Sequence, residues 1–213
     1  MGTDPLAQSE PKKRPPGQVP VTQSSMSLLV YEFIETDVAN ALIVVRPLNK
    51  SLVFVSLAGS KMKLINEANR FVSQANSSLK KKGVQFILKD RTILEPEGSE
   101  WLEQLTSDFT QLLTCGTIQN EIKCEYLTGT EFQKKVWEIT KTLKPGVKVS
   151  YHQLATLVGN PKAARAVGSA LGKNNIAVVI PCHRIVGSDG KLTGFRWGVE
   201  LKKTLLRLEE AIV

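Results

Sequence analysis

The sequence predicts an α+β fold in which a region of mixed strands and helices precedes a mostly helical one. Short runs of β-branched and aliphatic residues, separated by polar turns, occupy much of the first half of the chain. In the second half, apolar residues recur at helical spacing, with glycine and proline at the ends of the expected helices. The chain has 213 residues, 42% of them hydrophobic, and is therefore long enough to bury a sizeable core.

Residues 1–25 contain five prolines among polar residues and show no periodicity, so we expect a disordered N-terminal extension. Within it, Lys12-Lys13-Arg14 is a weak nuclear import signal, and a solubilising tail is the alternative interpretation. On this signal we expect a nuclear location, and otherwise a cytoplasmic one. No apolar run approaches the roughly 20 residues of a membrane span, and we expect no membrane partner.

Residues 26–126 are predicted to form an N-terminal α/β structural domain without catalytic residues. Its first β-like runs should pair as antiparallel strands. We expect one helix over residues 61–73, where apolar positions recur near helical spacing, and an amphipathic helix over residues 98–113. The predicted strands are Leu29–Ile34, Ala41–Arg46, Leu52–Leu57 and Gln85–Leu88.

Residues 127–213 are predicted to form a second domain, which begins with a helix. Thr128 or Thr130 should cap the start of this helix, and Pro145-Gly146 should end it. This part of the chain also carries the whole excess of positive charge. Residues 134–213 hold 14 basic and 5 acidic side chains, whereas the preceding residues hold 14 and 15. A basic domain favours nucleic acid as partner, and a solvated lysine-rich surface is the alternative.

Two further short helices are expected over residues 149–158 and 162–172. They are joined through Gly-Asn-Pro, with the proline in the first turn of the second helix, which is the outline of a helix-turn-helix. The second helix surrounds Arg165 with small residues that allow close approach to another surface, either a DNA groove or the protein's own core. These small residues are Ala163, Ala164, Ala166, Gly168, Ser169 and Ala170.

Cys182 follows a buried-type apolar run and a proline, and precedes His183 and Arg184. A thiolate is the reactive form of cysteine, and a neighbouring base or cation favours that form. The sequence therefore indicates a nucleophile, and a small buried hydrophobic residue is the alternative. Only two other cysteines, Cys115 and Cys124, and one other histidine accompany it, so a disulfide framework or a zinc site is not expected.

Read together, several segments resemble the O6-alkylguanine-DNA alkyltransferases in order and spacing. The resemblance covers most of the C-terminal half, whereas the N-terminal half resembles the ribonuclease-H-like domain of that family only in size and in the order of strands and helices. The matching segments are Gly129-Thr130, Phe132-Gln133, Val136-Trp137, Ser150-Tyr151, the run from Asn160 to Gly168, the run from Ile180 to Val186, the run from Gly190 to Phe195, and Lys202 with Leu205-Leu206.

The resemblance implies direct reversal of DNA damage in a single turnover. Cys182 would accept the alkyl group of O6-alkylguanine irreversibly, without a cofactor or metal. His183 would take the thiol proton through a water molecule, and Glu209 would orient His183. Tyr151 would donate a proton toward guanine N3, and Asn174 would link the recognition helix to the cysteine turn.

The same resemblance implies double-stranded DNA as partner, bound through the minor groove by a monomer and largely without sequence preference. The target base would be flipped out of the duplex, and Arg165 would fill the space that it leaves. Tyr151 would crowd the phosphate of the target nucleotide. Ala163, Ala164 and Gly168 are small enough for a narrow groove.

The residues implied for the base pocket are Ile185, Phe195, Arg196 and Trp197. Many relatives have tyrosine where this chain has Phe195, and small residues are common in mammalian members where it has Arg196 and Trp197. The bulky, charged rim is expected to narrow the pocket and to disfavour benzyl-sized adducts.

Two other functions are compatible with the residues themselves. A non-enzymatic helix-turn-helix protein would bind DNA in the same way but would lack an acceptor such as Cys182. A cysteine hydrolase would need a separate oxyanion site and a histidine remote in sequence.

Overall fold

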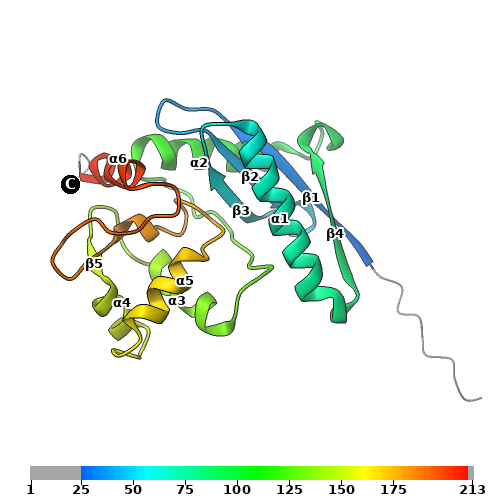
Figure 1. Cartoon of the computed structure of the whole chain (residues 1–213). Coiled ribbons are helices and arrows are strands. Elements are labelled where there is room, and N and C mark those ends of the chain that lie inside the picture. Colours follow the sequence, from blue (N-terminus) through cyan, green and yellow to red (C-terminus); the bar gives the residue numbers. More distant parts are fainter. Residues whose placement is uncertain (1–24, 211–213) are drawn as a thin grey trace, which may run out of the picture.

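The computed structural model describes residues 25–210 (Figure 1). The predicted extension lies outside these residues, except for Ser25, which begins the first strand. The predicted import signal at residues 12–14 also lies outside them. The α+β class is confirmed, with a mixed sheet and its helices first and a helical region after it.

The N-terminal region is built on a four-stranded sheet in the order β3-β2-β1-β4. The first three strands are antiparallel, as predicted, whereas β4 lies parallel to β1. β4 can run parallel to β1 because the helix between β3 and β4 carries the chain back to the end of the sheet at which β1 begins. The strands are β1 (Ser25–Ile34), β2 (Ala41–Arg46), β3 (Ser51–Leu57) and β4 (Val84–Asp90).

Two helices, α1 (Lys61–Leu79) and α2 (Glu100–Cys115), cover opposite faces of this sheet. Along β1 and β2, core residues alternate between the α1 core and the α2 core, as the period of two requires. In β3 the consecutive residues Val53 and Phe54 both belong to the α1 core, next to the register shift in its pairing with β2. The prediction ended α1 at residue 73, six residues too early. Its polar last turns remain helical because Ala75 continues the buried stripe against the sheet. Three short 3-10 turns, η1 (Pro47–Asn49), η2 (Lys80–Lys82) and η3 (Arg91–Ile93), complete this region.

The C-terminal region contains four α-helices, α3 (Glu131–Lys141), α4 (Tyr151–Leu157), α5 (Ala164–Gly172) and α6 (Val199–Glu210). Thr130 is the N-cap of α3: its hydroxyl accepts from the Gln133 backbone N–H, and the Gln133 side chain accepts from the Thr130 N–H. The same capping box, from Ser150 and Gln153, begins α4.

The helices predicted from residues 98, 149 and 162 each begin two residues later than predicted, and for the last two the reason is clear. Residues 149–150 form β5 (Val149–Ser150), because they pair with β6 (Ile185–Val186) next to the cysteine segment. Pro161 lies in a turn before α5, and not in its first turn. The Ala163 N–H donates to Asn160 O at 2.9 Å, which closes the turn and delays the helix to Ala164.

The edge strand β3 joins the two regions. The Val55 N–H donates to Asn175 O of the C-terminal region at 2.7 Å. The Leu52 N–H donates at 2.8 Å to Lys123 O, in the segment that leads to that region. The segment after Asn175 runs into the core between the sheet, α2 and α6. The residues that lead to Cys182 are thus an extension of the N-terminal sheet and share its hydrophobic core.

Among the helices in residues 25–210, none combines the length and apolar composition that crossing a bilayer requires.

The backbone of Gly129, just before α3, has a φ of 104°, and a Cβ there would lie 2.7 Å from the Trp137 ring. We predict that Gly129→Ala lowers the free energy of unfolding by about 2 to 4 kcal/mol, since backbone strain and overpacking add. Gly98→Ala is the matched control. Gly98 has a φ of 84° with no atom within 4 Å of a built Cβ, so only the backbone cost of about 1 to 2 kcal/mol applies. Equal losses in urea unfolding would contradict the close contact with Trp137.

Candidate active site

Two tight turns place Cys182 at the end of the buried run. The Val179 N–H donates to Ala177 O at 2.8 Å around Val178, and the Cys182 N–H donates to Ile180 O at 2.8 Å around Pro181. Val178 has a φ of 68°, which costs a β-branched residue about 1 to 3 kcal/mol. Burial of this segment in the core holds the strained turn. The cysteine therefore begins a rigid 3-10 turn, η4 (Cys182–Arg184).

The Cys182 sulfur is buried and accepts a hydrogen bond from Asn174 Nδ2 at 3.3 Å. Asn174 lies just after α5. It also donates to Ile180 O at 3.1 Å and accepts from the Ile176 N–H at 2.8 Å. Burial raises the pKa of the Cys182 thiol, while the Asn174 hydrogen bond and the nearby charge of Lys202 act in the opposite direction. The resting group is therefore a thiol, and Asn174 and Lys202 are the neighbours that stabilise the anion once the proton leaves.

His183 is fixed by Glu209 of α6, with 2.6 Å between His183 Nε2 and Glu209 Oε1. Burial lowers the pKa of His183, so the ring is neutral near pH 7. Since Nε2 donates a hydrogen bond to the carboxylate and keeps its proton, the other ring nitrogen, Nδ1, carries the lone pair. Nδ1 is buried and has no hydrogen-bond partner among the described residues. The site therefore contains an oriented base with one free acceptor atom.

Arg184 does not face the thiol, although its place in the sequence suggested a cation beside the sulfur. Its Nε and Nη2 atoms donate to Glu209 Oε1 at 3.0 and 2.8 Å, and its Nη1 donates to Leu143 O. Burial alone would raise the pKa of Glu209, but the hydrogen bonds from His183 and Arg184 prevail and hold it at about 2. Glu209 is therefore a carboxylate at any physiological pH.

Lys202, also on α6, is fully buried and has no carboxylate partner among residues 25–210. Its ammonium group donates to the carbonyls of Ile185, Thr193 and Gly194. Burial lowers the pKa of Lys202, and the neighbouring Cys182 acts against this shift. Lys202 thus fastens the segment 193–194 to β6 and brings positive charge toward the sulfur.

Cys182 lines a pocket of about 380 Å³. Tyr151 lies at its side and donates from its hydroxyl to Thr193 O at 3.4 Å, and burial raises the pKa of Tyr151. The lining residues are Tyr151, Gly168, Leu171, Gly172, Cys182, Gly194, Phe195 and Arg196.

Two residues predicted for the base pocket do not line it. Ile185 is fully buried, because its strand pairs with Val149 and its side chain packs in the core of the C-terminal helices. The Trp197 indole turns toward the sheet, where its N–H donates to Ser56 Oγ at 3.2 Å. Trp197 instead supports the pocket wall from behind, with its ring 5.2 Å from that of Phe195.

The predicted DNA-contacting residues lie at the start and middle of α5. The Arg165 side chain is exposed, and Ala163 and Ala164 are half-buried. Gly168 is one turn beyond Ala164 on α5 and lines the pocket beside Tyr151. One helix therefore presents both the arginine and a wall of the pocket that contains Cys182.

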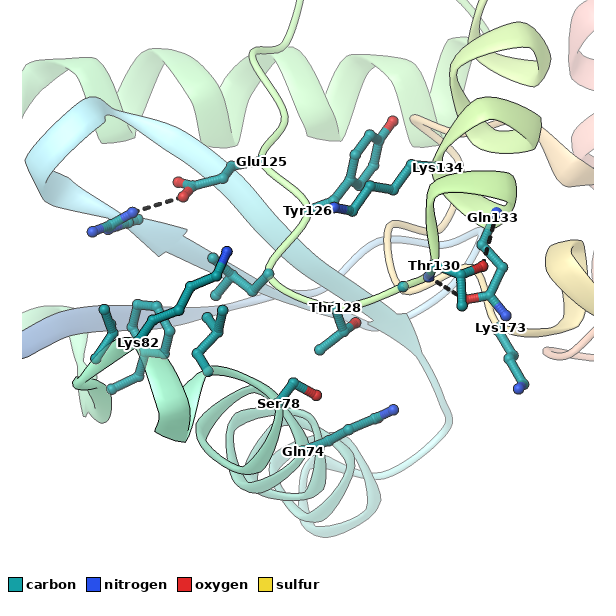
Figure 2. Close-up of a pocket in the computed structure, with 16 residues that line it drawn as sticks. Gln74, Ser78, Lys82, Glu125, Tyr126, Thr128, Thr130, Gln133, Lys134 and Lys173 are labelled. Carbon is teal, nitrogen blue, oxygen red and sulfur yellow. Dashed lines mark hydrogen bonds and ion pairs between the residues drawn. The ribbon is translucent and has the colours of Figure 1, made fainter.

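A second cleft, of about 620 Å³, lies between α1 with η2 and the start of α3 (Figure 2). Lys82 lies at one end of it and Lys173 at the other. Its acidic lining residue, Glu125, accepts from Arg46 at 2.6 Å and from Asn49 at 2.7 Å. This cleft contains no sulfur and no imidazole. Within residues 25–210, no group of three His, Cys, Asp or Glu side chains is placed to hold a metal ion.

Comparison with known proteins identifies relatives of this chain. A family model described as "6-O-methylguanine DNA methyltransferase, DNA binding domain" matches residues 131–211. A methylated-DNA–protein-cysteine methyltransferase of Kluyveromyces lactis is 65% identical over 186 residues, which cover 87% of this chain and 98% of that relative. The chain belongs to the methylated-DNA–protein-cysteine methyltransferase family. The resemblance inferred from the motifs is thereby confirmed.

A further relative and a solved structure extend this comparison. The Saccharomyces cerevisiae protein is 39% identical over 86% of this chain and 94% of its own length. The crystal structure of Mycobacterium tuberculosis OGT in complex with DNA shares the fold, with a TM-score of 0.60 at 24% identity. That match covers 85% of this chain and 93% of the other.

The buried Glu209 carboxylate should make the free energy of unfolding of this methyltransferase depend on pH under acidic conditions. Its pKa of about 2 lies below the ordinary 4.5, so its contribution to stability is present above pH 4.5 and is lost as pH falls toward 2. This contribution is on the order of 3 kcal/mol. We predict that urea unfolding of Glu209→Gln is much less dependent on pH in this range than that of the wild type. Glu210→Gln, at an exposed neighbour, should retain the wild-type dependence, and parallel curves for Glu209→Gln and wild type would contradict the prediction.

Proposed function

We propose that the protein repairs O6-alkylguanine in DNA by transferring the alkyl group to Cys182, once per molecule. The observation that carries this proposal is the position of Cys182. Its sulfur lines a pocket of about 380 Å³ and is held by Asn174, while the adjacent His183 is oriented by Glu209. Family membership supplies the reaction, and this arrangement supplies the groups that the reaction needs.

In the proposed reaction, the Cys182 thiol loses its proton through a water molecule to His183 Nδ1. The sulfur then attacks the alkyl carbon, so that an S–C bond forms while the C–O6 bond breaks and its electron pair passes to the guanine. Tyr151 donates a proton toward N3 and thereby neutralises the leaving base. The sulfur supplies the electron pair itself, so no cofactor is required. The thioether product is a poor leaving group, and the reaction ends there.

The DNA side of the proposal rests on α4 and α5, which we interpret as a helix-turn-helix that enters the minor groove. Guanine O6 is inaccessible within the stacked duplex, so the nucleotide must rotate into the pocket at a cost of a few kcal/mol. The exposed Arg165 would occupy the vacated space, and Ala163, Ala164 and Gly168 would allow close approach to the groove. The affinity of such minor-groove and phosphate contacts falls as the salt concentration rises, and it depends little on the DNA sequence.

We also propose a division of labour near residue 126. The N-terminal region, with the order of strands and helices of a ribonuclease-H-like fold, would support the pocket, and residues 127–213 would bind DNA and accept the alkyl group. A single chain contains every group that the mechanism uses, which favours action as a monomer. Nuclear import remains a proposal that rests on residues 12–14.

The decisive experiment uses intact-mass analysis after incubation with duplex DNA containing O6-methylguanine. We predict one methyl-sized mass gain per molecule, confined to the peptide that carries Cys182, with guanine restored in the DNA. Cys182→Ser should gain no mass, whereas Cys115→Ser, at an exposed cysteine, should react as the wild type does. Methyl removal by Cys182→Ser would overturn the proposal, as would a folded wild-type protein that leaves the lesion intact.

The size of the pocket leads to a prediction about larger adducts. Arg196 and Phe195 narrow the pocket that contains Cys182. We therefore expect free O6-benzylguanine to inactivate the wild-type protein at least about tenfold more slowly than it inactivates the Arg196→Ala variant, in which the arginine side chain is absent. Residual methyl transfer after timed exposure to the free base measures this rate. Rapid inactivation of the wild-type protein would remove the basis of the prediction.

A further inference from the structure

Arg196 and Trp197, which follow the pocket wall Phe195, are held by two residues of the N-terminal region. The Trp197 N–H donates to Ser56 Oγ of β3 at 3.2 Å, and the Ser56 hydroxyl donates to Glu67 Oε2 of α1. The same Glu67 oxygen lies 3.8 Å from Arg196 Nη2. Since residues 196 and 197 are consecutive, these contacts form a closed ring of four side chains.

The ring is built from groups with little freedom. Ser56 is fully buried, and the side chain of Glu67 is only 19% exposed. The Arg196 guanidinium also lies over the Trp197 ring, 5.4 Å from its centroid. Its Nη1 donates to Asn174 O at 3.1 Å and to Asn175 Oδ1 at 3.2 Å. The Arg196 guanidinium is thereby held between Trp197 and Glu67 on one side and Asn174 and Asn175 on the other.

The position of Arg196 determines where the pocket ends. Arg196 and Gly172 line the pocket that contains Cys182, and both also line a neighbouring groove of about 310 Å³ that extends toward Gln74 of α1. The Arg196 side chain therefore forms part of the wall between the two spaces. If it were released, the pocket would open into the groove, and Phe195 would lose the fixed Trp197 ring behind it.

We propose that Ser56 and Glu67 are positioning residues that set the size of adduct accepted at Cys182, acting through Trp197 and Arg196. This inference rests on the proposed alkyl transfer and gives the N-terminal region a specific part in it. Neither residue touches the substrate. Together they keep the wall closed, which favours small alkyl groups, and they keep Phe195 in place against the guanine.

The test measures transfer rates from two otherwise identical DNA duplexes, one with O6-methylguanine and one with O6-benzylguanine. For Glu67→Gln and Ser56→Ala, the ratio of the benzyl rate to the methyl rate should rise at least about fivefold, which is the scale of coupling between contacting side chains. The control is Glu35→Gln, which removes an exposed ion pair of the same region, with Lys61 at 2.7 Å, and should leave the ratio unchanged.

A double-mutant cycle separates positioning from general stability. In the Arg196→Ala background, Glu67→Gln should change the ratio by less than about twofold, because the residue through which it acts is gone. The proposal is overturned if Glu67→Gln leaves the ratio unchanged, lowers both rates equally, or has its full effect without Arg196. Glu67 and Arg196 are both partly exposed, so this cycle decides the matter even if the buried Ser56→Ala variant does not fold. A wild-type protein that transfers no methyl group refutes the proposed function itself, which is a separate outcome.

Discussion

The buried carboxylate of Glu209 is the constraint on which the site depends. Its side chain is 2% exposed, and an unpaired charge at such a position would cost several kcal/mol. The Arg184 guanidinium balances this charge, and His183 and Arg184 both donate hydrogen bonds to the carboxylate. Arg184 is itself anchored just after α3 through Leu143 O. The orientation of His183 therefore follows from the need to provide hydrogen-bond donors for the buried Glu209 carboxylate.

This arrangement also shapes the surrounding elements. The end of α2 approaches α6 so closely that a Cβ on Gly116 would lie 3.1 Å from Glu209 Cγ, and the glycine has a φ of 76°. On the other side, the segment after Asn175 pairs with the edge strand β3 and continues into the strained turn at Val178. The N-terminal region thus holds both the carboxylate and the cysteine turn, although it contributes no group that reacts.

The sequence was informative where local chemistry decides structure. The bounds of β2 could be predicted from its β-branched run, and the N-cap of α3 could be narrowed to Thr128 or Thr130. The structure selects Thr130, through its capping box with Gln133. The position of Pro161 before α5 could not, because a proline in a turn and a proline in a first helical turn have the same local pattern. The last turns of α1 were missed because polar residues dominate them, and only Ala75 and Leu79 pack against the core.

For the site, the motifs identified Cys182 and its neighbours, but not how their side chains are directed. Arg184 adjoins the cysteine in sequence and yet points to Glu209, which requires knowledge of where α6 packs. Trp197 turns to Ser56 for the same reason, since a partner 141 residues away leaves no local signal. Charge pairing over such separations is a property of the tertiary structure, and the sequence pattern does not contain it.

The place of the last described helix in the chain determines when, during synthesis, Cys182 gains the groups that surround it. Both buried charges that surround the cysteine turn, Lys202 and Glu209, come from α6, which is the final helix in chain order. A nascent polypeptide that has released Cys182 from the ribosome but still holds α6 in the exit tunnel has a thiol without an oriented base. The acceptor thiol therefore gains its oriented base only after α6 has emerged and packed against the cysteine turn.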